Sequence, residues 1–164
     1  MRHILLLASR SVLGGYLAVH GAQKLFGSFG GQGLDAAAVG FESMGLRPGK
    51  AAAAFAGASE LGGGLMTATG IADPLGPLAI AGSMAVATTV LRTKGPLSRD
   101  GGFELPLTNL ALALGLIIAG PGRFRLGSSL PRPWARLAAL GALVISGLSM
   151  SQVVRASSAV PPTS

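Results

Sequence analysis

Apolar residues dominate five long stretches of this chain, and only short polar segments separate them. The stretches cover Ile4–Phe26, Ala51–Ala72, Pro74–Leu91, Leu105–Gly120 and Trp134–Val154. Each approaches the roughly 20 residues that a helix needs to cross a hydrocarbon layer about 30 Å thick. The pattern therefore predicts an all-α, multi-pass membrane protein with one helix per stretch. Five crossings would place the two termini on opposite sides of the membrane.

The connections between the stretches differ in length and character. Glycine-rich residues 27–33 break the first helix, and residues 34–46 form a weakly amphipathic piece that is expected to lie in the membrane interface or to dip back into the bundle. Arg10 interrupts the first apolar run, so this helix is expected to remain uncleaved. Residues 156–164 are expected to form a flexible polar tail.

Composition supports a membrane location. Hydrophobic residues make up 49% of the chain and charged residues 12%, below the roughly 25% that is usual in soluble domains. The 26 glycines suit membrane helices, whose backbones approach closely through small residues. The net charge of +7 is spread over helix ends, so we expect contact with membrane lipids and no binding of nucleic acid. Lysine and arginine counts on the two sides are too close to fix the orientation.

Ionisable residues inside two of the apolar stretches mark a candidate site. Such groups are costly at membrane depth and normally face the bundle interior, where they find a partner. Arg10, His20 and Lys24 lie in the first stretch, and Glu60 lies in the second. Both stretches carry small residues at helical spacing, so the two helices are predicted to pack face to face and to pair Glu60 with one of the three basic residues. Asn109 adds an amide from the fourth stretch.

The resulting polar intramembrane cluster of Arg10, His20, Lys24, Glu60 and Asn109 has two interpretations. A buried ion pair can simply fix which helices pack together. Alternatively, His20 and Lys24 donate hydrogen bonds to a quinone carbonyl while Glu60 handles a proton. The second interpretation predicts a cavity for the quinone headgroup between the first, second and fourth stretches, and the competing outcome is a closed bundle.

No intrinsic cofactor or metal site is predicted. The chain contains no cysteine, so it has no thiol ligand for an iron–sulfur cluster. Its two histidines, His3 and His20, lie near opposite ends of one helix, about 25 Å apart, and cannot both ligate one haem.

Four motifs, in order, resemble those of the DoxX family of small membrane proteins. Val19–Gly27 is similar to the end of the family's first helix, and Ala58–Leu65 is similar to its second-helix motif. Gly101–Leu107 and Gly120–Phe124 resemble the bounds of its fourth helix. The resemblance implies a four-helix bundle in the cytoplasmic (inner) membrane of a bacterium or archaeon. Family members include the small subunit of a thiosulfate:quinone oxidoreductase, and others assemble with redox or detoxification proteins.

Two departures from the family pattern lie in the C-terminal part. The chain continues with Arg125-Leu126-Gly127 where the family often has a Ser-Leu-Asp-like sequence, and it adds a fifth apolar stretch after Trp134. We therefore expect a DoxX-like bundle over residues 1–126, an additional membrane helix over 127–155 and the tail over 156–164.

Three functional hypotheses follow from the sequence and the resemblance. The first is a quinone-proximal or structural accessory subunit of a membrane redox assembly, with other membrane-complex subunits as partners. The second is a small proton-coupled carrier or channel that uses Glu60 and His20. The third is a purely structural anchor for a larger complex.

Overall fold

The computed structural model describes residues 1–158 and is all-α over this range, as the sequence predicts, with no β-strand among the described residues. The helices are α1 (Arg2–Phe26), η1 (Ser28–Gly30), α2 (Gly33–Ser43), α3 (Gly49–Thr69), α4 (Leu75–Leu91), η2 (Arg92–Lys94), η3 (Ser98–Asp100), α5 (Glu104–Ala119) and α6 (Arg132–Ser158).

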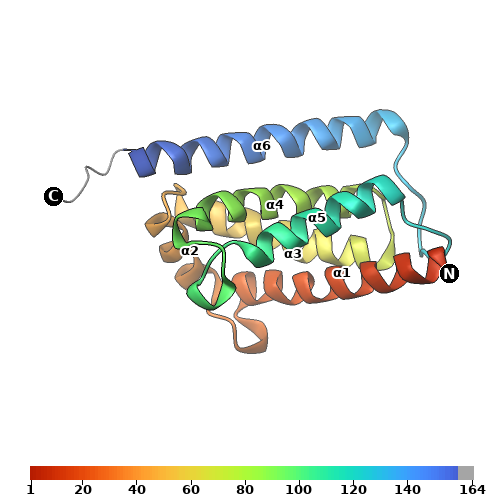
Figure 1. Cartoon of the computed structure of the whole chain (residues 1–164), viewed down its shortest axis with the longest axis horizontal. Coiled ribbons are helices and arrows are strands. Elements are labelled where there is room, and N and C mark those ends of the chain that lie inside the picture. The colour runs from red at the N-terminus through yellow and green to blue at the C-terminus, as the bar shows by residue number, and fades with distance from the viewer. Residues whose placement is uncertain (159–164) are drawn as a thin grey trace.

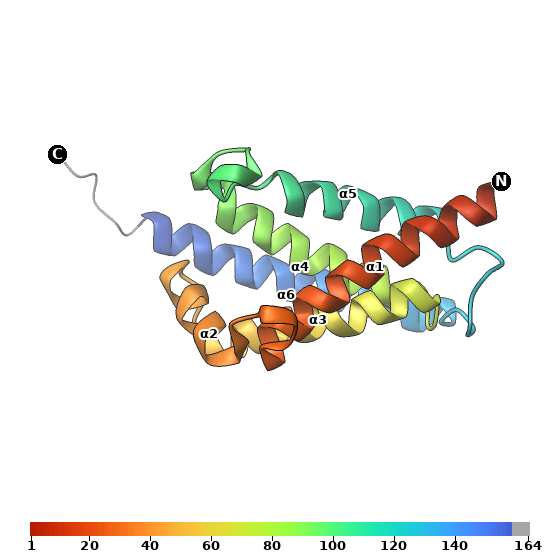
Figure 2. The same ribbon diagram turned by 90° about the horizontal axis from the view of Figure 1, so that it is seen from below.

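The five long helices run along one axis in alternating directions (Figure 1). Met1 and the last turn of α6 therefore lie at opposite ends of the bundle. The short helix α2 lies at the end where α1 finishes and α3 begins (Figure 2). Here a backbone amide and an ion pair tie α2 to α3. Glu42 accepts a hydrogen bond from the Gly49 amide at 3.1 Å, and Lys50 pairs with Asp35 at 2.7 Å.

Within residues 1–158, three helical segments are long and apolar enough to cross a membrane. They are Arg2–Phe26, Leu75–Lys94 and Arg132–Ala156, and α5 is a shorter apolar helix of 16 residues. The 21-residue α3 is not among them, because its many glycines and Glu60 lower its hydropathy. The number of membrane crossings therefore stays a prediction, although every expected stretch forms a helix.

Glycines bring α1 and α3 into backbone contact, as their spacing predicted. A Cβ atom added at Gly14 would lie 2.4 Å from the carbonyl oxygen of Gly64, and one added at Gly21 would lie 2.3 Å from the amide nitrogen of Leu61. Beside this contact, α1, α4 and α5 share an apolar core that is built from Leu13, Leu17, Ile80, Ala81, Met84, Ala113 and Leu116. The tight α1–α3 contact fixes where the polar side chains of these two helices meet.

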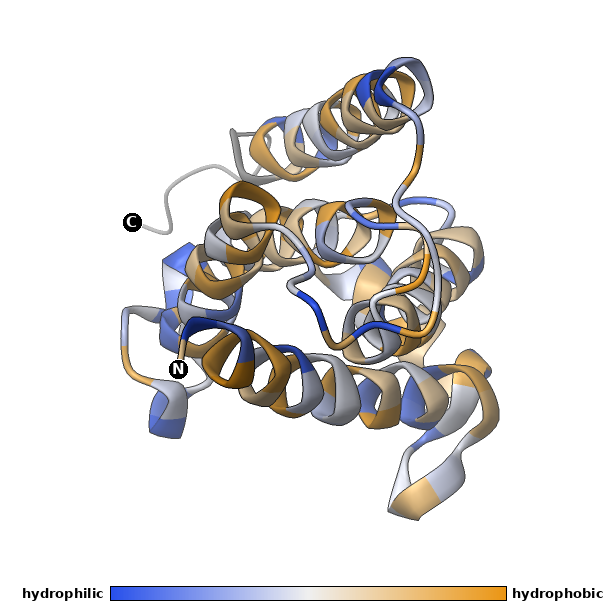
Figure 3. Ribbon diagram, turned by 90° about the vertical axis from the view of Figure 1, so that its right-hand side faces the viewer, coloured by the Kyte–Doolittle hydropathy of each residue, from blue (hydrophilic) through white to orange (hydrophobic). Residues whose placement is uncertain are grey.

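The additional helix α6 stands outside the group formed by α1, α3, α4 and α5 (Figure 3). It packs along α4, where a Cβ atom on Gly82 would come within 2.8 Å of the Ser146 hydroxyl. A second close approach lies near its C-terminal end, where a Cβ atom on Gly45 would meet Ala156 at 2.7 Å. Since α6 extends to Ser158, the first three residues of the expected tail are helical, and the remainder lies outside the described residues.

Candidate functional site

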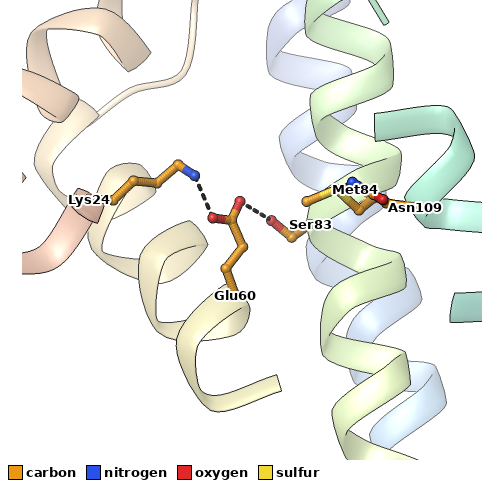
Figure 4. Close-up of polar contacts among 5 residues, drawn as sticks. All are labelled: Lys24, Glu60, Ser83, Met84 and Asn109. Atoms are coloured by element: carbon orange, nitrogen blue, oxygen red, sulfur yellow. Dashed lines mark hydrogen bonds and ion pairs between the residues drawn. The ribbon is translucent and has the colours of Figure 1, made fainter. Parts of the chain in front are cut away.

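The candidate site is centred on an ion pair between α1 and α3. The ammonium group of Lys24, in the last turn of α1, donates to Oε2 of Glu60 in the middle of α3 (Figure 4). The Glu60 side chain is only 6% exposed, whereas that of Lys24 is 29% exposed. The predicted pairing of Glu60 with a basic residue of the first helix is confirmed, and the partner is Lys24.

A hydroxyl group from α4 completes the surroundings of the carboxylate. The Ser83 hydroxyl donates to Oε1 of Glu60 at 3.5 Å, so that Glu60 lies between Lys24 and Ser83 (Figure 4). Sequence reasoning missed Ser83. The available signal was a hydroxyl residue, one of three in α4, but the sequence does not state which neighbouring helix such a residue faces.

Asn109 is buried as expected but does not reach Glu60. Its side-chain amide donates to the sulfur atom of Met84 at 3.8 Å, and it also interacts with the Tyr16 side chain. Ser83 and Met84 are adjacent in sequence, so they point to different sides of α4, and Figure 4 shows Asn109 on the Met84 side. Asn109 therefore belongs to the contact between α1, α4 and α5 and not to the carboxylate.

Arg10 also lies outside the cluster, which corrects the prediction. Lys24 lies fourteen positions further along α1, which is about 21 Å along a helix. Its Nε atom donates to the Thr67 carbonyl at 3.0 Å, and its Nη2 atom donates to the carbonyls of Ala68 at 3.1 Å and Phe124 at 2.8 Å. Nη1 donates to the Pro121 carbonyl. The last carbonyls of a helix lack partners within the helix, so Arg10 caps α3 and does not pair with a carboxylate.

The turn between α3 and α4 carries a buried carboxyl group near this arginine. Asp73 is 8% exposed, and burial raises its pKa above the usual range, while the charges of Arg10 and Arg125 act in the opposite direction. Gly70 ends α3 in the left-handed conformation, with φ 73°, and a Cβ atom there would lie 3.0 Å from the guanidinium carbon of Arg10. The Arg10 region is thus a closely packed helix end.

His20 does not join the ion pair either. The histidine is exposed and meets the ring of Tyr16, one turn earlier on α1, edge-on at a centroid distance of 5.4 Å. It faces a hollow of about 390 Å³ beside α2, whose other polar side chains are Gln23, Lys24 and Gln32.

A larger cavity of about 560 Å³ adjoins the ion pair on the other side. It lies between α2, α3, α4 and α6, so the predicted position between the first, second and fourth stretches is wrong. Lys24, Glu60 and Ser83 line it, but His20 and Asn109 do not. At the expected position, glycine contacts bring α1 against α3, and Asn109 packs on Met84. The space arises instead where α6, which packs on α4, stands off from α3.

Most of the cavity wall is aliphatic or aromatic. Phe55, Leu78, Val86 and Ile145 are among its lining residues, and hydroxyl groups come from Ser59, Ser83, Ser146 and Ser149. Lys24 and Glu60 are the only charged residues among those that line it in the described part of the chain. The cavity thus combines an apolar interior with a single ion pair at one wall.

Apolar helices of this length, glycine-mediated packing and buried ionisable residues define a small integral membrane protein. The family model for DoxX matches residues 5–93, which is more than half of the chain, and the chain therefore belongs to the DoxX family. This match covers nearly all of α1 and the whole of α2, α3 and α4, including both residues of the ion pair, while α5 and α6 lie beyond it. No curated protein and no solved structure matches the chain.

Proposed function

We propose that this DoxX-family protein is a multi-pass subunit of a bacterial or archaeal inner membrane that binds a lipid-soluble quinone next to a redox partner. The observation that carries the proposal is the cavity between α2, α3, α4 and α6, whose apolar wall presents the Lys24–Glu60 pair. A purely structural anchor needs the ion pair but has no need of the cavity.

The size and lining of the cavity suit an amphiphilic ligand. Its volume of about 560 Å³ falls within the range of about 300–1,000 Å³ that is typical of small-molecule sites, which are mostly apolar with a few convergent polar groups. An isoprenoid chain would occupy the aliphatic part. The headgroup would then lie against the wall where Lys24, Glu60 and Ser83 meet.

Each polar residue at this wall has a distinct chemical role in the proposal. The ammonium group of Lys24 and the hydroxyl group of Ser83 are hydrogen-bond donors for a carbonyl oxygen. The carboxylate of Glu60 holds Lys24 in position and, once it has been protonated from water, gives that proton to the reduced quinone. Electrons would come from a partner subunit, because the chain has no cysteine with which to ligate an iron–sulfur cluster of its own.

A glycine of α6 allows a direct test, because filling the cavity there leaves the ion pair untouched. Gly141 lines the cavity, and a Cβ atom at this position meets no atom within 4 Å. Gly147 on the same helix also has open space but does not line the cavity, so Gly147→Phe is the matched control for Gly141→Phe.

The experiment is purification of the full chain from native membranes in mild detergent, followed by mass spectrometry of extracted quinones per mole of protein. We expect quinone with the wild type and with Gly147→Phe, and its loss with Gly141→Phe. Equal amounts in all three proteins, or no quinone in the wild type, would contradict the proposal and leave the structural-anchor hypothesis.

A further inference from the structure

Two hollows of different character meet at Lys24. One is the apolar cavity described above. The other, which we call the vestibule, has a volume of about 390 Å³ and is lined by the polar side chains His20, Gln23, Lys24 and Gln32 and by the backbone of Gly30–Gly33. Lys24 lines both of them.

The vestibule lies at an end of the bundle where polar groups are accessible. His20 and Gln32 are exposed and Gly40 is half-buried, and the segment between α1 and α2 that borders the vestibule contains no long apolar side chain other than Phe29. The cavity, in contrast, extends along α4 and α6 among aliphatic residues. Water is therefore expected to fill the vestibule and to avoid the cavity.

The wall between the two hollows is thin. Lys24, Phe41 and Met44 are the residues that line both, and Lys24 is the only one of the three that bears a charge. Its side chain is 29% exposed, yet its ammonium group contacts a carboxylate that is 6% exposed (Figure 4). Lys24 is thus partly accessible to water and also contacts the carboxylate of Glu60, which is shielded from water.

We propose that Glu60 exchanges protons with water through the vestibule, with Lys24 as the relay. In one step, Nζ of Lys24 gives a proton to Oε2 of Glu60, so that the ion pair becomes a neutral pair. In the next step, the neutral amine of Lys24 takes a proton from a hydronium ion in the vestibule, which becomes water. The sum is the uptake of one proton by Glu60, with Lys24 unchanged.

Few other titratable groups lie around the Lys24–Glu60 pair, so few other side chains could carry the proton to Glu60. On α1 these are His20 at the vestibule and Tyr16, which senses the charge of Glu60. The α4 side contributes the hydroxyl group of Ser83, and the α2 and α6 residues of the two hollows include no acidic or basic side chain. The biological purpose of this proton uptake rests on the proposed function, because the reduction of a quinone consumes protons. The test of the proton route itself needs no quinone.

The sequence contains no cysteine, so a single introduced cysteine provides the only thiol in an accessibility test. The full chain carrying Glu60→Cys is placed in nanodiscs of zwitterionic lipid in chloride-free buffer. Ag⁺, a small ion that does not cross lipid readily, is added, and intact-protein mass spectrometry follows formation of the thiol adduct. We expect Ag⁺ to reach this thiol from the aqueous phase.

Blocking variants decide the route. Gly40 lines the vestibule and has no atom within 4 Å of an added Cβ, so Gly40→Phe fills the vestibule with little strain. This variant is expected to slow the reaction about tenfold or more, which is about 1.4 kcal/mol on the barrier. Gly141→Phe fills the cavity, and Gly15→Phe adds a ring at an exposed site away from both hollows, so neither should change the rate.

A second thiol keeps the ion pair intact. Ser83→Cys lies behind Glu60 as seen from Lys24, and it should react more slowly than Glu60→Cys (Figure 4). Adding Lys24→Ala opens the wall and should accelerate it. The inference would be overturned if the Glu60→Cys thiol never reacted with Ag⁺, if Gly40→Phe left its reaction rate unchanged, or if Gly141→Phe slowed it. It would also be overturned if Lys24→Ala did not accelerate the reaction of the Ser83→Cys thiol. None of these outcomes depends on whether quinone co-purifies, so the two proposals fail separately.

Discussion

Lys24 in the last turn of α1 holds Glu60 in the middle of α3, and Lys24 borders both the cavity and the vestibule. The contact depends on glycines, because a Cβ atom at Gly21 would lie 2.5 Å from the carbonyl oxygen of Gly57. The same close approach that joins the helices therefore positions the carboxylate.

Removal of one partner of the pair should destabilise the protein. Glu60→Gln leaves the Lys24 ammonium without its carboxylate, and we expect a loss of about 1–3 kcal/mol, less than the 3–5 typical of a fully buried pair because Lys24 is partly exposed. The double variant Lys24→Met/Glu60→Leu should unfold closer to the wild type. Thermal unfolding in detergent, followed by circular dichroism, checks this, and a double variant less stable than Glu60→Gln would contradict it.

Arg10 should not be replaceable by lysine. Its guanidinium group donates to four carbonyl oxygens, two on α3 and two in the segment after α5, and a single ammonium group cannot match this fork. Arg10→Lys and Arg10→Met should both lower stability by about 2 kcal/mol or more, since hydrogen bonds to charged groups contribute about 1.5–3 kcal/mol each. Full stability of Arg10→Lys in thermal unfolding would refute the capping role.

Asp73 should make the wild type less stable as pH rises. Burial raises its pKa in the folded state, so the folded protein binds more protons than the unfolded chain, whose aspartates titrate near 3.9. Stability is therefore lost as pH climbs from about 3.9 through the raised folded pKa. Asp73→Asn should match the wild type at pH about 3.5 and exceed its melting temperature at pH about 7.

The matched control for this pH experiment is Asp35→Asn. Asp35 is fully exposed, and its hydrogen bond to Lys50 and the charge of that lysine lower its pKa. Its small contribution should have the opposite sign, being present above the unfolded pKa and lost as pH falls. An Asp73→Asn variant whose melting temperature shifts equally at both pH values would show that the carboxyl group does not titrate as argued.

Two neighbouring glycines of α1 should respond oppositely to an added side chain. Gly14→Val places atoms against the backbone of Gly64 and Ala68 and should separate α1 from α3, whereas Gly15 faces open space. Gly15→Ala should be neutral or stabilising by up to about 1 kcal/mol, because glycine costs that much inside a helix. Unfolding temperatures of the two variants provide the comparison, and equal losses would argue against the tight α1–α3 contact.

Helix α6 should cross the membrane. Its segment Arg132–Ala156 is apolar and long enough to span, so reporter fusions after Ser128 and after Ser164 should report different compartments. The same compartment for both would mean that α6 lies along the membrane surface.

The helices and the ion pair could be predicted because each depends on local pattern. Apolar run length located the long helices, and glycine spacing with a lone carboxylate identified the α1–α3 contact. The position of Arg10 could not be read in this way. Its partners are backbone carbonyls at the end of α3 and after Pro121, and no side-chain pattern encodes where such carbonyls converge.

The cavity was misplaced for a different reason. Its location depends on how far α6 stands from α3 and α4, and that distance follows from tertiary contacts at Gly82 and Gly45. The spacing of residues in the sequence shows which of them share one face of a helix. It does not show how far that face lies from the face of another helix. Ser83 was missed and Asn109 was misassigned because the sequence does not state which neighbouring helix each side chain faces.

The position of α6 has an evolutionary consequence. The family-matched helices provide the ion pair, while a helix beyond the match supplies one wall of the cavity. Substitutions along α6 can therefore reshape the cavity while leaving the α1–α3 contact unchanged. The α6 wall of the cavity and the α1–α3 contact therefore lie in separate parts of the chain, so selection can alter the first without compromising the second.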